Sequence, residues 1–109
     1  MNKIKLCIIY IILIITILSL LIYIDTYYHE EAHKQISIYY GCINYDININ
    51  MFSGSFVCHE YRNTTTQEML DQENYLHSLN EIKSYNESKY IFMFILIICI
   101  IFVHLSFRF

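Results

Sequence analysis

The residues best suited to chemistry lie together in the motif His29-Glu30-Glu31-Ala32-His33. In a helix, this spacing places His29 and His33 on one face about one turn apart, so that both imidazoles can bind one zinc ion. Glu30 follows the first histidine, where its carboxylate can take a proton from a water molecule activated by the metal. The motif therefore predicts a zinc site with Glu30 as the catalytic base.

Two imidazoles do not complete a catalytic zinc site, because such a site needs a third protein ligand and an open position. The best candidate for the third ligand is Glu81, which follows Asn80 in a segment with a helical pattern. His77 is the alternative, since it shares a helical face with Glu81 and three histidines can also hold zinc.

The HEEAH motif, followed further along the chain by a helical Asn-Glu pair, resembles the two-helix zinc site of the gluzincin metallopeptidases. The resemblance implies that His29, His33 and Glu81 bind zinc and that Glu30 is the base. It also implies that a strand edge binds the substrate, for which residues 43–51 are the candidate. The family usually has an acidic residue four positions after the ligand glutamate, which orients a histidine. This chain has Tyr85 there.

A second interpretation of the motif needs no metal. A helix that leaves a membrane can carry charged residues simply because that face is solvated, and Glu30 and Lys34 have the spacing of an ion pair along a helix. His59, beside Cys58, is expected to be a surface histidine rather than a ligand.

Two apolar runs account for the composition of the chain. Hydrophobic residues make up 56% and charged residues 16%, against about 45–50% and about 25% in ordinary globular proteins. The excess is concentrated in residues 6–24 and 91–107. As helices these runs would be roughly 28 and 26 Å long, close to the roughly 30 Å hydrocarbon core of a bilayer. We therefore expect a mainly α membrane protein with two transmembrane helices and the lipid bilayer as a partner. The composition argues against a soluble enzyme of ordinary size and a multidomain protein, and the net charge of -3 argues against nucleic-acid binding.

The charged residues indicate an orientation. All ten acidic residues lie in residues 25–90, whereas two lysines precede the first run and an arginine follows the second. The positive-inside rule then places the tips, residues 1–5 and 108–109, in the cytoplasm and the loop of residues 25–90 outside. A cleaved secretory leader is the alternative for residues 6–24, but the run is long for a leader and no small-residue cleavage site follows it. An uncleaved signal-anchor is the better interpretation.

The external loop is expected to begin and end with helices. Asp25 or Thr26 fits a helix N-cap and Gly41 fits the position after a helix end, which predicts a helix up to Tyr40. Thr65, with a glutamate three residues later, matches a capping box, and the apolar residues that follow recur at helical intervals. This second helix would run towards the second span.

Between these helices the sequence predicts a β-hairpin. Residues 43–51 alternate between apolar and polar, which indicates a strand, and Ser53 and Gly54 form a turn into a shorter strand at residues 55–58. Cys42 and Cys58 are the two cysteines of the loop, and outside the cell they can form a disulfide that contributes about 3 kcal/mol. Two free thiols are the alternative. A tight hairpin would hold the two cysteines far apart, so the hairpin and the bridge compete, and the bridge is the preferred interpretation.

Asn63 and Asn86 begin two Asn-x-Ser/Thr sequons that an external loop would expose to glycosylation.

Taken together, the expected protein is a small membrane-tethered zinc hydrolase that acts on peptides near the bilayer. The alternative is a non-catalytic structural or interaction protein. The bias towards Ile, Asn, Tyr and Lys indicates an AT-rich genome, and short two-span chains of this style resemble membrane proteins of viruses, which would lie in a host membrane.

Overall fold

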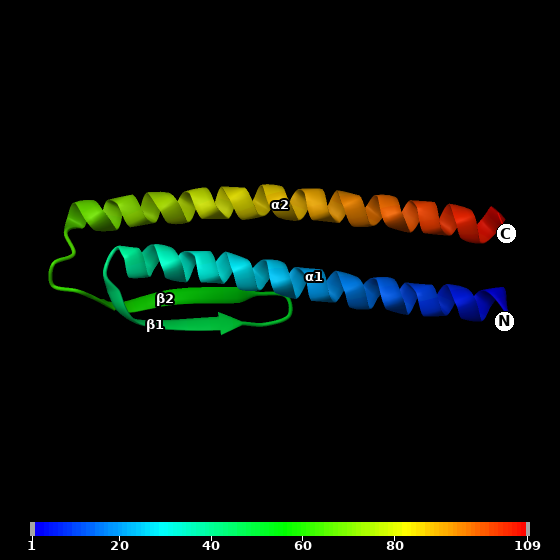
Figure 1. Cartoon of the computed structure of the whole chain (residues 1–109), viewed down its shortest axis with the longest axis horizontal. Coiled ribbons are helices and arrows are strands. Elements are labelled where there is room, and N and C mark those ends of the chain that lie inside the picture. The colour runs from blue at the N-terminus through cyan, green and yellow to red at the C-terminus, as the bar shows by residue number, and fades with distance from the viewer. Residues whose placement is uncertain (1, 109) are drawn as a thin grey trace.

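The chain forms two long antiparallel helices with a β-hairpin packed along the first (Figure 1). The computed structural model describes residues 2–108, and the elements in chain order are α1 (Lys3–Tyr39), β1 (Cys42–Ile49), β2 (Gly54–Tyr61) and α2 (Gln67–Arg108). The molecule is elongated, with extents of 66 × 21 × 13 Å. Both chain ends lie at the same end of the helix pair, and the hairpin lies beside the other half of α1. The predicted hairpin between two long helices with apolar segments is confirmed, but the helices predicted on either side of it are continuous with those apolar helices rather than separate elements.

Helix α1 runs without interruption from the apolar run into the loop. The predicted N-cap at Asp25 or Thr26 is wrong, because the Thr26 hydroxyl donates to the Ile22 carbonyl at 2.9 Å inside a continuous helix. Neither glycine nor proline occurs before Gly41, so nothing in the sequence breaks the helix there. The helix ends where predicted, and Gly41 adopts a φ of 103°, a conformation that favours glycine.

Helix α2 begins one residue later than the predicted capping box requires. The hydroxyl of Thr66, not of Thr65, accepts the Met69 backbone N–H at 3.3 Å. The Thr65 hydroxyl instead donates to the Tyr40 carbonyl at 3.0 Å. Thr65 therefore satisfies the end of α1, because the connection after β2 returns the chain to that point. From Gln67 the helix continues through the second apolar run to Arg108.

The hairpin and the disulfide coexist. The bridge between Cys42 and Cys58 is confirmed, and the predicted competition between bridge and hairpin is wrong. Cys42 pairs with Tyr61 and Cys58 with Tyr45, which in a regular ladder would leave the cysteines roughly 10 Å apart along the strand. The register is irregular between Cys42 and Tyr45, and the two cysteine Cα atoms lie 6.1 Å apart.

The interior of the hairpin end is small and mostly polar. Among residues 2–108, the buried apolar residues are Tyr40 and Cys42, whereas Glu30, Ser37 and Glu73 are buried polar residues. A conventional hydrophobic core is therefore not what holds these elements together. The Cys42–Cys58 disulfide and the polar contacts between the elements have to supply that stability.

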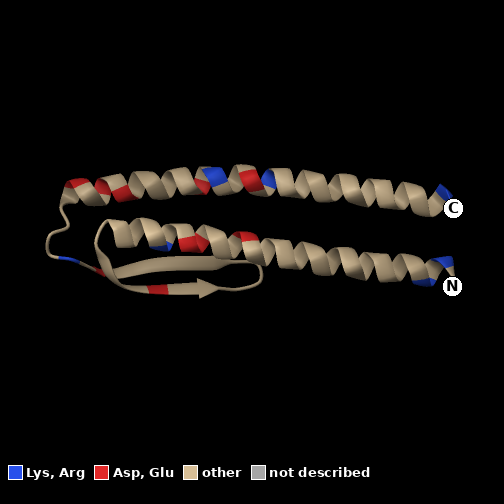
Figure 2. Cartoon of the chain, in the orientation of Figure 1, with Lys and Arg blue, Asp and Glu red and all other residues tan. Residues whose placement is uncertain are grey.

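The other halves of the two helices are apolar and lie side by side. Each helix contains a segment long and apolar enough to cross a membrane. Charged residues are absent from these segments and reappear at the helix ends (Figure 2). The rings of Tyr10 and Phe102 pack with centroids 4.3 Å apart. The Ser88 hydroxyl donates to the Asp25 carboxylate at 2.9 Å, and this contact joins the helices where the polar halves begin.

Removing the disulfide should loosen the hairpin end specifically. The bridge closes a sequence separation of 16 residues, for which its loss should cost about 3 kcal/mol. In Cys42→Ser, the backbone amides of β1 and β2 should therefore exchange hydrogen about 100-fold faster than in the wild type. Hydrogen exchange followed by mass spectrometry measures this change. Cys7→Ser, in the apolar half, is the control, and unchanged protection in Cys42→Ser would contradict the stabilising role of the bridge.

Candidate metal centre

The two histidines of the HEEAH motif project from one face of α1 towards α2. Their ring centroids lie 4.6 Å apart, as the spacing of four residues predicts. Glu81 of α2 lies opposite them, and its Oε1 atom is 3.2 Å from His29 Nε2 and 2.9 Å from His33 Nε2. The Asn80 side chain donates to the His29 backbone carbonyl at 3.3 Å. The predicted ligands His29, His33 and Glu81 are thus brought together from two helices.

The three facing atoms have the arrangement of a metal site. The two Nε2 atoms are 3.2 Å apart, and both are near Glu81 Oε1. Around a tetrahedral zinc ion, nitrogen and oxygen ligands lie roughly 3.3–3.5 Å from one another. The observed separations differ from these values by only a few tenths of an ångström. His29, His33 and Glu81 could therefore hold a metal ion with little rearrangement.

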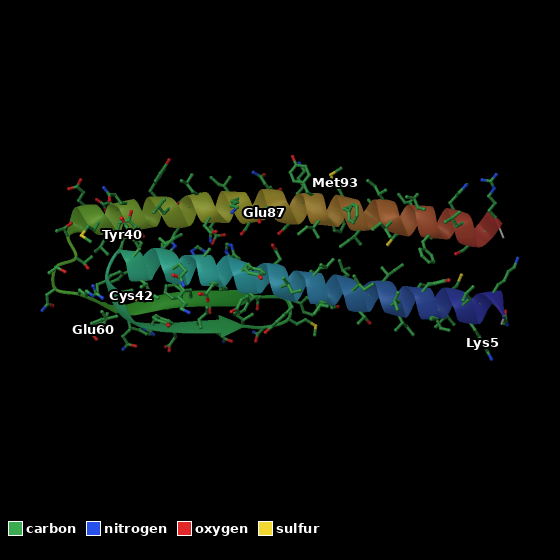
Figure 3. The ribbon with its side chains drawn as sticks, in the orientation of Figure 1. Lys5, Tyr40, Cys42, Glu60, Glu87 and Met93 are labelled. Carbon is green, nitrogen blue, oxygen red and sulfur yellow. A yellow bond between two sulfur atoms is a disulfide. The ribbon has the colours of Figure 1, made fainter. Side chains whose placement is uncertain are left out.

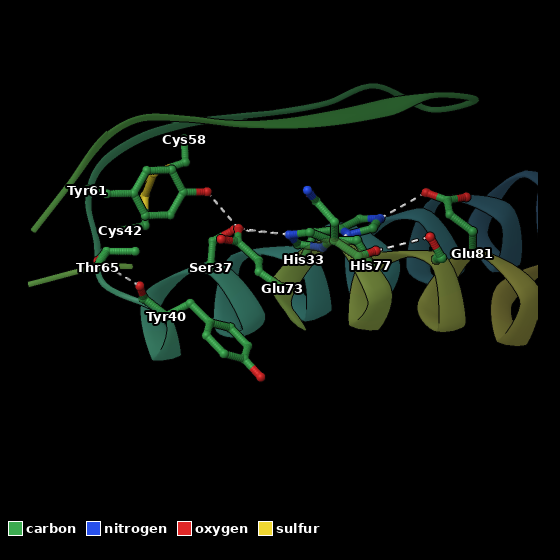
Figure 4. A network of polar contacts seen from close by, with 12 residues as sticks. His33, Ser37, Tyr40, Cys42, Cys58, Tyr61, Thr65, Glu73, His77 and Glu81 are labelled. Carbon is green, nitrogen blue, oxygen red and sulfur yellow. Dashed lines mark hydrogen bonds and ion pairs between the residues drawn. A yellow bond between two sulfur atoms is a disulfide. The ribbon is translucent and has the colours of Figure 1, made fainter. Parts of the chain in front are cut away.

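His77 is not one of the three converging ligands. It orients the His33 ring from the side opposite Glu81. Its Nδ1 atom lies 2.6 Å from His33 Nδ1, on the side of the ring away from Glu81. His77 Nε2 lies 3.1 Å from the Glu73 carboxylate, to which it donates. His77 Nδ1 is then an acceptor, so His33 donates from Nδ1 and keeps a free lone pair on Nε2. The network (Figure 4) thereby selects the tautomer of His33 that a metal requires.

Glu73 anchors this network in the interior. Its Oε1 atom accepts from the Ser37 hydroxyl at 2.6 Å and from the Tyr61 hydroxyl at 2.7 Å, besides His77. Burial and the neighbouring Glu73 carboxylate raise the pKa of Tyr61 to about 12, so this phenol stays protonated and can donate. The other oxygen, Glu73 Oε2, is buried without a hydrogen-bond partner among the described residues.

His29 has its own partner on α2. Its Nδ1 atom lies within hydrogen-bond distance of the Ser84 hydroxyl. When the ring donates from Nδ1 to that hydroxyl, the lone pair of Nε2 points towards Glu81. Each ligand histidine thus has a polar partner on α2 that holds its ring, as ligand histidines in metal sites usually do.

The electrostatics of the cluster favour a neutral His33 imidazole and an ionised Glu81 carboxylate. Burial lowers the pKa of His33, and this effect outweighs the opposing effect of the nearby Glu81 carboxylate. Burial alone would raise the pKa of Glu81, but the proximity of His33 and His29 lowers it overall. Metals bind these same protonation states, because neutral imidazole and carboxylate offer lone pairs.

Glu30 lies beside the ligands in a shared cavity. The cavity has a volume of about 390 Å³, and its walls include Glu30, His33 and Glu81. Glu30 is 5% exposed, and among residues 2–108 no side chain forms a hydrogen bond or ion pair with its carboxylate. A Cβ atom at Gly54 would lie 2.6 Å from Glu30 Cγ, so the glycine makes room for this side chain. An unpaired carboxylate therefore lines the cavity next to the ligand cluster.

Several predicted contacts are replaced by others. Lys34 pairs with Glu31 at 3.3 Å, so the predicted pair of Lys34 with Glu30 is wrong. Tyr85, at the position where gluzincins usually have an acidic residue, is exposed, and the carboxylate of the orienting network comes from Glu73. His59 is on the surface as predicted, beside Asp46 at 2.6 Å.

The strand that lines the cavity is β2, not β1. Gly54, Ser55 and Phe56 of β2 belong to the cavity wall, whereas the proposed substrate edge at residues 43–51 lies on β1 and does not. The alternating pattern of β1 is the clearer of the two in the sequence, but it does not show how the hairpin packs on α1. Both sequon residues, Asn63 and Asn86, are exposed, and their glycosylation stays a prediction.

Comparison of the chain with protein-family models, with curated proteins and with solved structures finds no match. The resemblance to gluzincins therefore stays confined to the motif residues, and the metal site rests on its own geometry.

Metal binding can be measured directly. The purified full-length protein should bind one zinc ion, and His33→Ala should not retain it, because one of three converging ligands is lost. His59→Ala, which removes an exposed histidine outside the cluster, should bind zinc like the wild type. Elemental analysis after dialysis gives the stoichiometry. Wild-type protein without zinc, or His33→Ala with full occupancy, would contradict the site.

Substitutions of His77 can test whether this residue orients His33 or binds the metal itself. His77→Leu removes the acceptor for His33, so zinc affinity should fall roughly 10–100-fold. His77→Gln offers an amide that can accept from His33 and donate to Glu73, and it should recover most of that loss. Competition with a zinc-binding dye measures the affinities, and the ¹⁵N shifts of His33 report its tautomer. Equal affinities for wild type and His77→Leu would disprove the orienting role.

Proposed function

We propose that the chain is a two-pass integral membrane protein with the hairpin end outside and both termini in the cytoplasm. In support, residues 6–24 and 91–107 carry no charge, and all acidic residues lie towards the hairpin end (Figure 2). Glu87 and Met93 of α2 illustrate the change, one in each half, and Lys5 lies near the terminal end (Figure 3). The positive-inside rule assigns that basic end to the cytoplasm.

We further propose that the metal centre is the active site of a zinc-dependent hydrolase. One observation carries this proposal: an unpaired, nearly buried Glu30 carboxylate lines the same cavity as His33 and Glu81. A purely structural zinc site is closed by four protein ligands and does not need an unpaired carboxylate beside it. Here three converging ligands leave a position open beside a candidate base.

The chemistry that fits these groups is hydrolysis of an amide bond. Zinc, when bound, would polarise the carbonyl of the scissile bond. Glu30 takes a proton from a water molecule in the cavity, and the water oxygen forms a bond to the carbonyl carbon. The C–N bond then breaks, and the proton passes from Glu30 to the leaving nitrogen. Glu30 ends the reaction as a carboxylate, as it began.

The surroundings of the cavity favour a peptide substrate near the membrane. The edge of β2 that faces away from β1 has no strand partner among the described residues. Ser55 and Phe56 of β2 belong to the cavity wall. An extended peptide can pair with such an edge through backbone hydrogen bonds. His29 follows the first apolar segment by little more than one helical turn. A peptide bound there would lie close to the bilayer surface.

Glu30→Gln separates catalysis from metal binding. This variant should bind zinc like the wild type but hydrolyse peptides at least about 100-fold more slowly, because the base is lost. The matched control is Glu31→Gln, which changes the adjacent carboxylate that pairs with Lys34. The assay uses full-length protein in lipid nanodiscs, with a peptide mixture analysed by mass spectrometry.

Three outcomes of this experiment are informative. Turnover lost only in Glu30→Gln supports the hydrolase. Zinc bound without turnover by the wild type would favour the alternative, a non-catalytic interaction protein of the membrane. Equal turnover in the wild type and Glu30→Gln would remove Glu30 from the mechanism.

A further inference from the structure

The tip of the hairpin lies where the polar and apolar halves of the helices meet. Residues 50–53 connect the strands, and the Asn50 N–H donates to the Ser53 carbonyl at 2.7 Å. Next to this turn, a Cβ atom at Gly54 would lie 2.9 Å from Thr26 Cγ2, which fixes the height of the tip along α1. Thr26 follows residues 6–24 almost directly. The tip therefore points along α1 towards the apolar halves (Figure 1).

The side chains at this tip are apolar and exposed. Met51 is 53% exposed and Phe52 is 71% exposed. In water, a turn that presents two large apolar side chains is unfavourable, and turns usually carry polar residues. At the height of a bilayer surface the same side chains would leave water instead of facing it. Their position gives this otherwise unusual turn a physical reason.

The lining of a groove beside the tip changes from apolar to polar along its length, as a phospholipid does. Its volume is about 580 Å³, and it is lined by Phe52 and by both helices. The part within residues 6–24 and 91–107 is apolar and includes Ile22, Phe92 and Ile95. The part just outside them includes Ser88 and Lys89. The groove thus passes from hydrocarbon-like to polar lining at the boundary of the spans.

Lys89 is the cation available in this groove. Asp25 also lines it, but this carboxylate accepts the Ser88 hydroxyl at 2.9 Å. Lys83 pairs with Glu87 at 3.8 Å, whereas Lys89 has no ion pair within residues 2–108. An ammonium group without a carboxylate partner, at the polar end of an apolar groove, suits the phosphate of a lipid head group.

We propose that Met51 and Phe52 insert into the outer leaflet and that the neighbouring groove holds a phospholipid, with its acyl chain among the apolar side chains and its phosphate at Lys89. The hairpin is then a third point of attachment to the membrane, after α1 and α2. The inference rests on the proposed two-pass arrangement but not on the metal site or the hydrolase.

The chain contains no tryptophan, so single substitutions create unique fluorescent reporters. Phe52→Trp is the test, Phe92→Trp in the second span is the membrane reference, and Tyr75→Trp on the polar half of α2 is the solvent reference. Each full-length variant is placed in phosphatidylcholine vesicles with and without brominated acyl chains. Intact disulfide and helical circular dichroism confirm that each variant is folded. Met51→Trp repeats the test at the neighbouring position if Phe52→Trp fails to fold.

Phe52→Trp should emit at short wavelength and lose roughly half of its intensity with brominated lipid, as Phe92→Trp should. Tyr75→Trp should be insensitive to brominated lipid and quenched by aqueous iodide. If Phe92→Trp is quenched by brominated lipid but Phe52→Trp behaves like Tyr75→Trp, the insertion of the tip is disproved while the spans stand. If Phe92→Trp is also insensitive, the two-pass arrangement itself fails.

The lipid site has a separate test. The delipidated full-length protein is titrated with phosphatidylglycerol and the bound lipid is counted by native mass spectrometry. Lys89→Gln should reduce the bound fraction several-fold, whereas Lys83→Gln, which removes a paired lysine that does not line the groove, should not. Equal binding by Lys89→Gln and the wild type would overturn the assignment of the phosphate to Lys89.

Discussion

The carboxylate of Glu73 is the contact on which the hairpin end depends. One of its oxygens accepts hydrogen bonds from Ser37 of α1, Tyr61 of β2 and His77 of α2. It therefore joins three elements at one buried point, 3% exposed. Hydrogen bonds to a charged group are stronger than those between neutral groups. A hydrophobic side chain at this position could not specify the mutual placement of the three elements in the same way.

Burying polar groups in this interior costs free energy, and other features of the fold have to offset that cost. Burying a carboxylate is unfavourable unless its hydrogen bonds are satisfied, and one oxygen of Glu73 has none among the described residues. With Tyr40 and Cys42 as the buried apolar residues of that part of the chain, hydrophobic burial offsets little of this cost. The disulfide lowers the entropy of the unfolded chain. The two spans would contribute further by confining α1 and α2 to one antiparallel arrangement.

The local features of the fold and the ligand residues were predictable from the sequence, because they follow from periodicity. The spacing of His29 and His33 placed both on one helical face, and Gly41 marked the end of α1. The gluzincin pattern places the orienting group after Glu81, at the position of Tyr85, whereas in this chain the orienting residues His77 and Glu73 precede Glu81. Glu73, His77 and Glu81 recur every four residues on one face of α2, and this spacing could have indicated the group.

Features that depend on the packing of elements far apart in the sequence could not be found this way. Ser37 and Tyr61 show their role only once the hairpin is packed on α1, where both side chains reach Glu73 of α2. Nothing in an alternating pattern reveals the irregular register that lets Cys42 reach Cys58. Thr66 rather than Thr65 caps α2 because the Thr65 hydroxyl donates to the carbonyl of Tyr40, at the end of α1.

The continuity of the helices links their apolar halves to the candidate metal centre. Because α1 and α2 are unbroken, a shift of one residue between them would move facing atoms by about 1.5 Å and turn the ligands by about 100°. Either change would separate Glu81 Oε1 from the two Nε2 atoms, now 3.2 and 2.9 Å away. The packing of Tyr10 on Phe102, near the chain ends, and the contact of Ser88 with Asp25, about one helical turn from His29, hold the same register. The apolar halves thus help to fix the alignment of the two helices that the candidate site requires.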